Sequence, residues 1–194
     1  MMPRIARESL MTLEAYAKAR PEFRARVIAH KKRRTVHLGE HVTLLFEDEL
    51  TMRYQVQEML RIERIFEPEG IDDELAAYNP LVPDGSNLKA TMLIEYDDPM
   101  ARAVALARLK GIAVATFVAV DGGEPVRAIA DEDLAREDAD KTSSVHFLRF
   151  ELAPAMIAAL KSGAALTIGV DHPGYRARVT LDTAARDALV ADLA

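Results

Sequence analysis

Hydrophobic and polar residues along the chain change their period several times, and the longest helical pattern falls on residues 47–66. The apolar residues of this segment recur at helical spacing and form one stripe, which comprises Met52, Val56, Met59, Leu60 and Phe66. The opposite side is polar and carries Tyr54, Gln57, Glu58, Arg61 and Arg64. Asp48 is suited to cap the N-terminus of this helix. We expect the apolar stripe to pack as a seam between two parts of the protein, which makes the polar face a candidate site.

The residues before this segment predict a helical arm over 1–34. Ser9 is suited to cap a first helix, and Pro21 to open a second one, because proline is well tolerated at the first position of a helix. A single kinked helix from Ser9 to Arg34 is the alternative.

Alternating apolar and polar residues over 35–47 predict a β-hairpin with a two-residue type II′ turn at Gly39-Glu40. Residues 37–41 also match the zinc-protease pattern H-x-x-E-H. That pattern places both histidines on one face only when it lies on a helix. Because the flanking residues favour strands, we do not expect a metalloprotease.

The remainder of the chain predicts a short helix over Ile71–Tyr78, a loop over 79–87, and then the same order of elements twice. The two units span 88–141 and 142–194, and each is expected to form strand, helix, strand, turn, strand and helix. Matching signals occur at matching places: a proline at the first helix start, a Lys…Gly helix end and an Asp-led turn. We expect both units to end in a helix, which Asp131 caps in the first unit.

These patterns together predict an α+β protein with a mixed, largely antiparallel sheet, an N-terminal helical arm and a duplicated β-α-β-β-α C-terminal body. The whole of 1–194 is expected to be a single domain, in which residues 35–87 form the hairpin, the long helix and the loop. The length of 194 residues suffices for one domain that buries roughly 70% of its unfolded surface.

The amino-acid composition argues against several classes of protein. No apolar run reaches the roughly 18 residues of a membrane span, and the N-terminus lacks the apolar core of a signal peptide, so we expect a cytoplasmic protein. The chain has no cysteine, which excludes disulfides, zinc–thiolate and iron–sulfur ligation, and thiol catalysis by its own side chains. We expect no cofactor.

Charge is distributed unevenly between the arm and the body. Residues 1–34 carry ten basic and three acidic residues, a net charge of +7, whereas the rest of the chain carries −13. A basic arm can bind nucleic acid or dock on an acidic body, either its own or that of a second copy. Docking is the preferred interpretation, because the arm has few aromatic residues to stack on bases.

Two histidines and their neighbours add to the candidate site. His146 shares the apolar face of its strand with Leu148, whereas Arg149 lies on the other face. A histidine in that position is usually part of the core, although a buried imidazole can also serve as acid, base or ligand. His172 lies in the tight turn before Tyr175, where a solvent-facing side chain is the simpler interpretation. The ligand-pocket candidates are therefore Tyr54, Gln57, Glu58, Arg61, His146, Arg149, His172 and Tyr175.

Recognised catalytic motifs are missing from the sequence. It has no G-x-S-x-G nucleophile elbow, no Walker loop, no G-x-G-x-x-G and no Glu-x-x-His pair on an expected helix. We expect no metal site, although histidines and glutamates distant in sequence can still meet in space.

Three stretches, at residues 54–65, 141–150 and 171–177, resemble a bacterial family known only as domain of unknown function 3501, and the segments 10–16 and 21–24 extend the likeness. The resemblance implies a single-domain cytoplasmic bacterial protein. It also implies an association with rubrerythrin-like and iron–sulfur proteins, and hence with a redox or peroxide-related pathway.

Three functions are therefore considered. The leading hypothesis is a non-catalytic accessory or interaction protein, a homodimer that acts with a redox partner. The first alternative is a small enzyme or ligand-binding protein whose pocket lies around His146, His172 and the helix over 50–66. The second alternative is nucleic-acid binding by the basic arm, which we consider unlikely.

Overall fold

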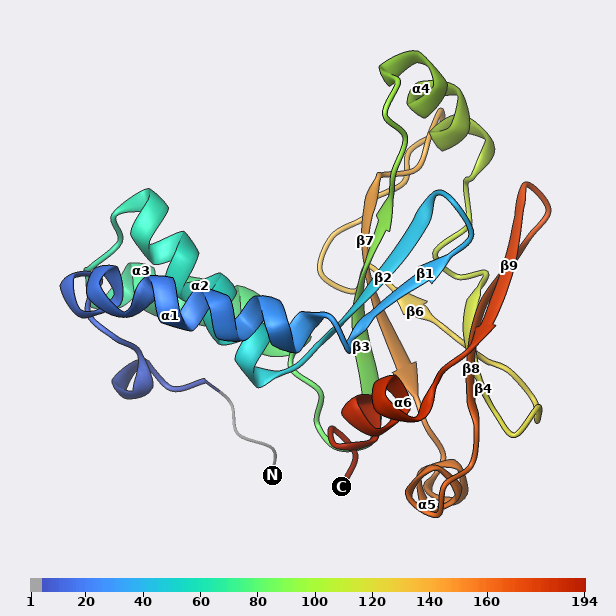
Figure 1. Cartoon of the computed structure of the whole chain (residues 1–194). Coiled ribbons are helices and arrows are strands. Elements are labelled where there is room, and N and C mark those ends of the chain that lie inside the picture. Colours follow the sequence, from blue (N-terminus) through green and yellow to red (C-terminus); the bar gives the residue numbers. More distant parts are fainter. Residues whose placement is uncertain (1–4) are drawn as a thin grey trace.

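The computed structural model describes residues 5–194, which form a unit of helices joined to a body of two β-sheets (Figure 1). All strand pairings in the described part of the chain are antiparallel, and the helical unit lies outside the two sheets (Figure 1). The protein is therefore of the α+β class, as predicted.

The helical unit contains α1 (Leu13–Lys31), α2 (Glu49–Glu63) and α3 (Pro68–Tyr78), with the short 3-10 helices η1 (Arg7–Ser9) and η2 (Asn79–Leu81). Helix α2 begins with a capping box, because Asp48 and Thr51 exchange side-chain bonds with each other's backbone N–H. Three residues of its predicted apolar stripe belong to a small core shared with α3 and the N-terminal segment, whereas Phe66 lies beyond the end of the helix and is 68% exposed. The core consists of Ile5, Met52, Val56, Leu60, Leu75 and Val82. The predicted seam is thus internal to the helical unit.

The larger sheet has the strand order β1-β2-β3-β7-β6. Its strands are β1 (Thr35–Leu38), β2 (Val42–Glu47), β3 (Asn87–Ile94), β6 (Ile129–Ala130) and β7 (Val145–Glu151). Strands β3 and β7 lie at its centre, and their register pairs Lys89 with Arg149 and Met92 with His146. Because side chains alternate along a strand, Lys89 and Arg149 lie on the outer face, and Met92 and His146 on the inner face.

The smaller sheet has the order β5-β4-β8-β9, formed by β4 (Thr116–Val120), β5 (Val126–Arg127), β8 (Leu166–His172) and β9 (Tyr175–Thr180). The inner faces of both sheets share one hydrophobic core, which also receives Leu106, Leu160 and Leu189 from the helices. These helices are α4 (Pro99–Arg108), α5 (Pro154–Lys161) and α6 (Thr183–Val190). In Figure 1, α4 lies at one end of the body, and α5 and α6 lie at the other.

The N-terminal arm differs from its preferred prediction. One helix, α1, runs through Pro21, and Thr12 rather than Ser9 caps it. Tyr16, Phe23 and Val27 form one buried face on both sides of the proline, so packing against α2 outweighs the lost backbone bond. The alternative of one long helix is therefore nearer to the structure.

Two turns also differ in detail. The β1–β2 pairing of Leu38 with Val42 leaves a three-residue loop rather than a two-residue turn, with Gly39 in the left-handed region at φ 70°. Gly174 has no positive φ, so its turn is not of type II, the type that its Pro-Gly sequence favours.

The largest difference concerns residues 125–140. The predicted strand 125–130 divides at Ala128, so that β5 joins the smaller sheet and β6 joins the larger. The acidic helix predicted after Asp131 does not form, and the segment is irregular. Asp131 adopts φ 53° and directs its carboxylate to residues on β7 instead of capping a helix.

The strand orders place β3 beside β7 in one sheet and β4 beside β8 in the other. Each neighbouring pair joins corresponding strands of the two units predicted from the sequence. A duplicated origin of the body stays a prediction. Within residues 5–194, no helix is both long and apolar enough to cross a membrane.

Candidate functional site

The polar face of α2 packs against α1 and the N-terminal segment. Gln57 is buried and is fixed by the backbone of Met11, whose N–H donates to its side-chain oxygen at 2.8 Å and whose carbonyl accepts from its amide at 3.3 Å. Tyr54 packs against Phe23, with ring centroids 6.0 Å apart. Both side chains therefore have structural contacts.

Glu58 joins α1 to α2. Its carboxylate accepts from the Tyr16 hydroxyl at 2.7 Å, from Arg20 Nε at 2.7 Å and Nη2 at 2.9 Å, and from Arg61 at 3.2 Å. The hydrogen bond from Arg20 lowers the pKa of Glu58 to about 2, whereas burial, together with Glu58, raises the pKa of Tyr16. Glu58 is a fixed anion and is poorly suited to proton transfer near neutral pH.

His146 is buried in a second network, far along the chain from α2. Its Nδ1 donates to Asp131 Oδ2 at 2.6 Å, and its Nε2 lies 3.0 Å from both the Thr142 hydroxyl and the Ser143 carbonyl. Both ring nitrogens are therefore engaged in tying β7 to the irregular segment before it.

His172 and Tyr175 hold the end of the β8–β9 hairpin. His172 Nε2 donates to the Lys110 carbonyl at 2.8 Å, and its Nδ1 accepts from the Gly174 N–H at 3.0 Å, an arrangement that fits the neutral ring. The Tyr175 hydroxyl donates to the Leu38 carbonyl at 2.5 Å and accepts from the His41 N–H at 3.1 Å.

The structure thus separates the predicted site residues into distinct networks. Neither His146 nor His172 is hydrogen bonded to Glu58 or Arg149. His37 and His41 of the zinc-protease pattern lie on a hairpin, as expected, and contact Thr43 and the Glu95 carbonyl. Among residues 5–194, no group of three histidine, aspartate or glutamate side chains is arranged to hold a metal ion.

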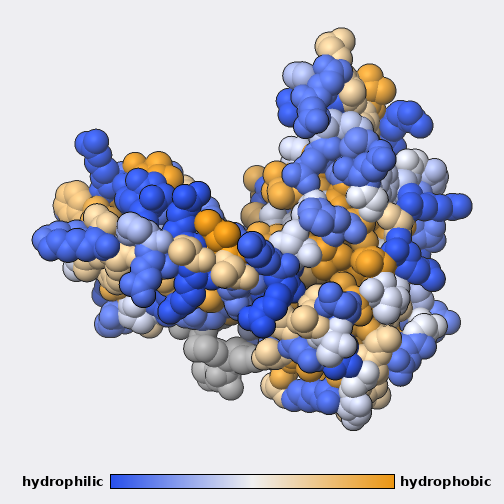
Figure 2. Space-filling view, in the orientation of Figure 1, coloured by the Kyte–Doolittle hydropathy of each residue, from blue (hydrophilic) through white to orange (hydrophobic). Residues whose placement is uncertain are grey.

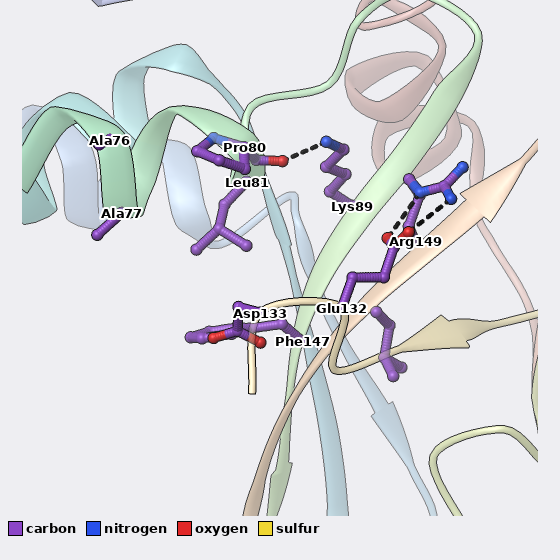
Figure 3. Close-up of a pocket in the computed structure, with 10 residues that line it drawn as sticks. Ala76, Ala77, Pro80, Leu81, Lys89, Glu132, Asp133, Phe147 and Arg149 are labelled. Atoms are coloured by element: carbon purple, nitrogen blue, oxygen red, sulfur yellow. Dashed lines mark hydrogen bonds and ion pairs between the residues drawn. The ribbon is translucent and has the colours of Figure 1, made fainter. Parts of the chain in front are cut away.

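Of the predicted residues, Arg149 lines a pocket of about 260 Å³ between the helical unit and the outer face of the larger sheet (Figure 3). Its walls come from four segments distant in sequence: Ala76, Ala77, Pro80 and Leu81; Lys89; Glu132 and Asp133; and Phe147, Leu148 and Arg149. The lining is largely apolar, with charged groups at one side.

The sequence did not indicate the other nine residues that line the pocket, and Lys89 is the lysine among them. Its ammonium donates to the Pro80 carbonyl, and burial lowers its pKa. Arg149, by contrast, is held by Glu132 through two bonds of 2.8 Å and by Glu151 through one of 2.5 Å. Strand alternation could have placed Lys89 and Arg149 on the same face of the sheet. Nothing in the sequence indicated that α3 covers that face.

A second feature is the exposed helix α4. Eight of its ten residues are exposed, and Arg102 and Arg108 are its charged residues. Met100 is 75% exposed and Val104 59% exposed. A groove of about 400 Å³ runs along this helix, with Asp98 near one end and Arg108 near the other. Figure 2 shows hydrophobic residues among hydrophilic ones at this end of the molecule.

The basic arm is partly neutralised within the chain. Arg20 pairs with Glu58, Lys18 with Glu14, and Arg34 with Asp192. Other cations of the arm, among them Arg24, Arg26, Lys32 and Arg33, are exposed.

The fold and these features define an α+β protein with two antiparallel sheets, a helical unit, and an apolar pocket between that unit and the larger sheet. The chain belongs to the family described as protein of unknown function DUF3501, whose model matches residues 4–193. A crystal structure of a novel protein of unknown function from Burkholderia pseudomallei K96243 is similar throughout, with 58% identity and a TM-score of 0.94. The match covers 99% of this chain and 100% of that one. No curated protein matches the chain.

Proposed function

We propose that this chain is a non-catalytic interaction protein that forms a homodimer through α4. The observation that carries the proposal is an exposed helix with an apolar surface. Contiguous exposed apolar residues on a soluble protein mark interaction sites more often than isolated ones do. The predicted site side chains support the non-catalytic part, because each is engaged in a structural contact.

A second copy is the occupant that the charges of α4 favour. Asp97 and Asp98 lie at its N-terminus, and Arg108 and Lys110 at or just beyond its C-terminus. Two copies that pack antiparallel around a twofold axis bring the acidic end of each helix against the basic end of the other. Ala101 and Ala105 line the groove one helical turn apart, so their small side chains permit a close approach.

Sedimentation velocity between about 1 and 100 µM tests the dimer, a range that covers ordinary affinities. We expect the wild type to dimerise, and the double variant Met100→Asp/Val104→Asp to remain monomeric while unfolding at the temperature of the wild type diluted to its monomer. Phe66→Asp is the matched control, because Phe66 is equally exposed but lies in the helical unit. A monomeric wild type, or a control that dissociates as readily, contradicts the proposal.

The redox association and the cytoplasmic location come from the family resemblance and sequence and remain proposals. The partner that they suggest is a rubrerythrin-like or iron–sulfur protein, to which this chain would be an accessory. Calorimetric titration of a purified rubrerythrin-like protein with this chain tests the association. Absence of saturable heat with both a rubrerythrin-like and an iron–sulfur candidate argues against it.

A further inference from the structure

The pocket between α3 and the larger sheet contains an ammonium group with unused hydrogen-bonding capacity. Lys89 has three N–H donors and gives one of them to the Pro80 carbonyl (Figure 3). Within residues 5–194, no carboxylate lies at ion-pair distance from it. Partial burial is the main cause of the lowered pKa of Lys89, as expected for a partly desolvated cation without a direct counter-ion.

The other charges around Lys89 already have partners. Glu132 and Glu151 both bind Arg149, and Asp84 accepts from the Ser86 hydroxyl and backbone N–H. These carboxylates attract Lys89 from a distance, whereas Arg149 repels it. A ligand anion at Lys89 therefore meets one cation with free donors, beside carboxylates that are held in place by their own bonds.

The rest of the pocket is suited to an apolar group. Ala76, Ala77 and Leu81 form the wall on the helical side, and Phe147 lies on the sheet side. A volume of about 260 Å³ holds about eight non-hydrogen atoms, if each occupies about 30 Å³ as water does in the liquid. Such a pocket selects by shape and apolar contact, while a few polar groups set the orientation of the ligand.

We propose that this pocket binds a small monocarboxylic acid, with its carboxylate on Lys89 and its apolar body between Leu81 and Phe147. A single negative charge fits better than a phosphate, because Glu132 and Asp133 border the pocket and would repel a doubly charged group. The pocket contains no residue of α4, so ligand binding and dimerisation can be tested and can fail separately.

NMR titration of isotope-labelled protein with hexanoate tests the proposal. Hexanoate has eight non-hydrogen atoms, and 1-hexanol is nearly the same length but has no charge. We expect saturable shifts in the methyl signals of Ala76, Ala77 and Leu81 on addition of hexanoate. Hexanol should bind at least about tenfold more weakly than hexanoate, which is the usual effect of losing one charge-assisted hydrogen bond. Equal affinity for both compounds, or shifts confined to other regions, overturns the proposal.

Variants assign the carboxylate to Lys89. Lys89→Met keeps the apolar stem and should weaken hexanoate about tenfold while leaving hexanol unchanged. Lys161→Met, at an exposed lysine at the end of α5, is the matched control and should bind as the wild type does. Thermal unfolding should show Lys89→Met to be as stable as the wild type, and Lys89→Gln provides a second variant if it is not. Wild-type affinity for hexanoate in a folded Lys89 variant overturns the assignment.

Discussion

Asp131 illustrates how one residue can override a local pattern. Its sequence context is typical of a helix cap, yet it adopts φ 53° and uses both carboxylate oxygens across the sheet. One oxygen accepts from the Phe147 N–H at 3.0 Å, and the other from His146 at 2.6 Å. The left-handed region disfavours most L-residues but tolerates asparagine and aspartate. This conformation places a buried imidazole beside a fixed acceptor.

We expect Asp131→Ala to lower the free energy of unfolding by about 2–3 kcal/mol, for two reasons. The substitution leaves the His146 donor unpaired, and alanine lacks the polar side chain that lets aspartate tolerate a positive φ. Asp131→Asn should cost about 1 kcal/mol, since it preserves the shape and the backbone preference. Urea unfolding measures both. Asp133→Ala, two residues along at an exposed position, is the control and should change stability by less than about 0.5 kcal/mol. Equal losses at 131 and 133 would contradict this account.

At the scale of single residues, the sequence could identify candidates but not their surroundings. Alternation placed His146 on the inner face of its strand and Arg149 on the outer face, and both positions hold in the structure. It could not predict that Asp131 binds His146, because that contact depends on the path of an irregular segment. Lys89 remained unnoticed because a lone lysine on an alternating strand is ordinarily solvated.

At the scale of elements, local signals predicted the elements well where the stabilising contacts are themselves local. Asp48, Asp98 and Asp182 each cap the helix that follows, with a backbone N–H bound by the side chain. The sequence predicted one strand over 125–130 where the structure has β5 and β6 in different sheets. The choice of sheet depends on pairing with β4 and β7, and a local pattern does not contain that information. The arm was uncertain at Pro21 for a similar reason, since its helix is maintained by packing on α2.

The pairing of α1 with α2 depends on Glu58, whose carboxylate is 12% exposed. Its depressed pKa of about 2 means that its contribution to stability is present above the usual pKa of about 4.5 and is lost as pH falls towards 2. Glu58→Gln should therefore cost about 2–3 kcal/mol at pH 7, and roughly half of that at pH 3. Urea unfolding at both values measures this change.

Glu14→Gln is the control for Glu58. It removes a carboxylate of α1 from an exposed ion pair with Lys18 on the same helix, and should cost less than about 0.5 kcal/mol at either pH. A Glu58→Gln penalty that does not depend on pH would indicate that packing rather than charge joins the helices.

At the scale of the whole molecule, a buried ionic cluster joins the helical unit to the sheets. Arg34 is 1% exposed and donates to the carbonyls of Phe46 at 3.0 Å and Ala188 at 2.7 Å, and to the carboxylate of Asp192. Its Nη1 also lies 3.5 Å from Asp48, the cap of α2. One side chain from the end of the arm thus contacts β2, the start of α2 and the C-terminal helix region.

Asp192 makes this joint sensitive to pH. Burial raises its pKa to about 6, even though Arg34 opposes the shift. An acid whose pKa is raised by folding contributes stability below its unfolded pKa of about 4, and loses that contribution as pH rises through 6. The wild type should therefore lose about 2–3 kcal/mol of unfolding free energy from this group between pH 4 and pH 8.

Asp192→Asn, which mimics the protonated acid, should remove that part of the pH dependence. Asp187→Asn, at an exposed carboxylate on α6, should retain it. Urea unfolding of the three proteins across this range measures the difference, and carboxyl ¹³C shifts of the wild type should titrate near pH 6 at Asp192. If Asp192→Asn keeps the wild-type pH profile, the ionised Arg34–Asp192 pair is stable in its buried site, and the joint between the two parts does not respond to pH.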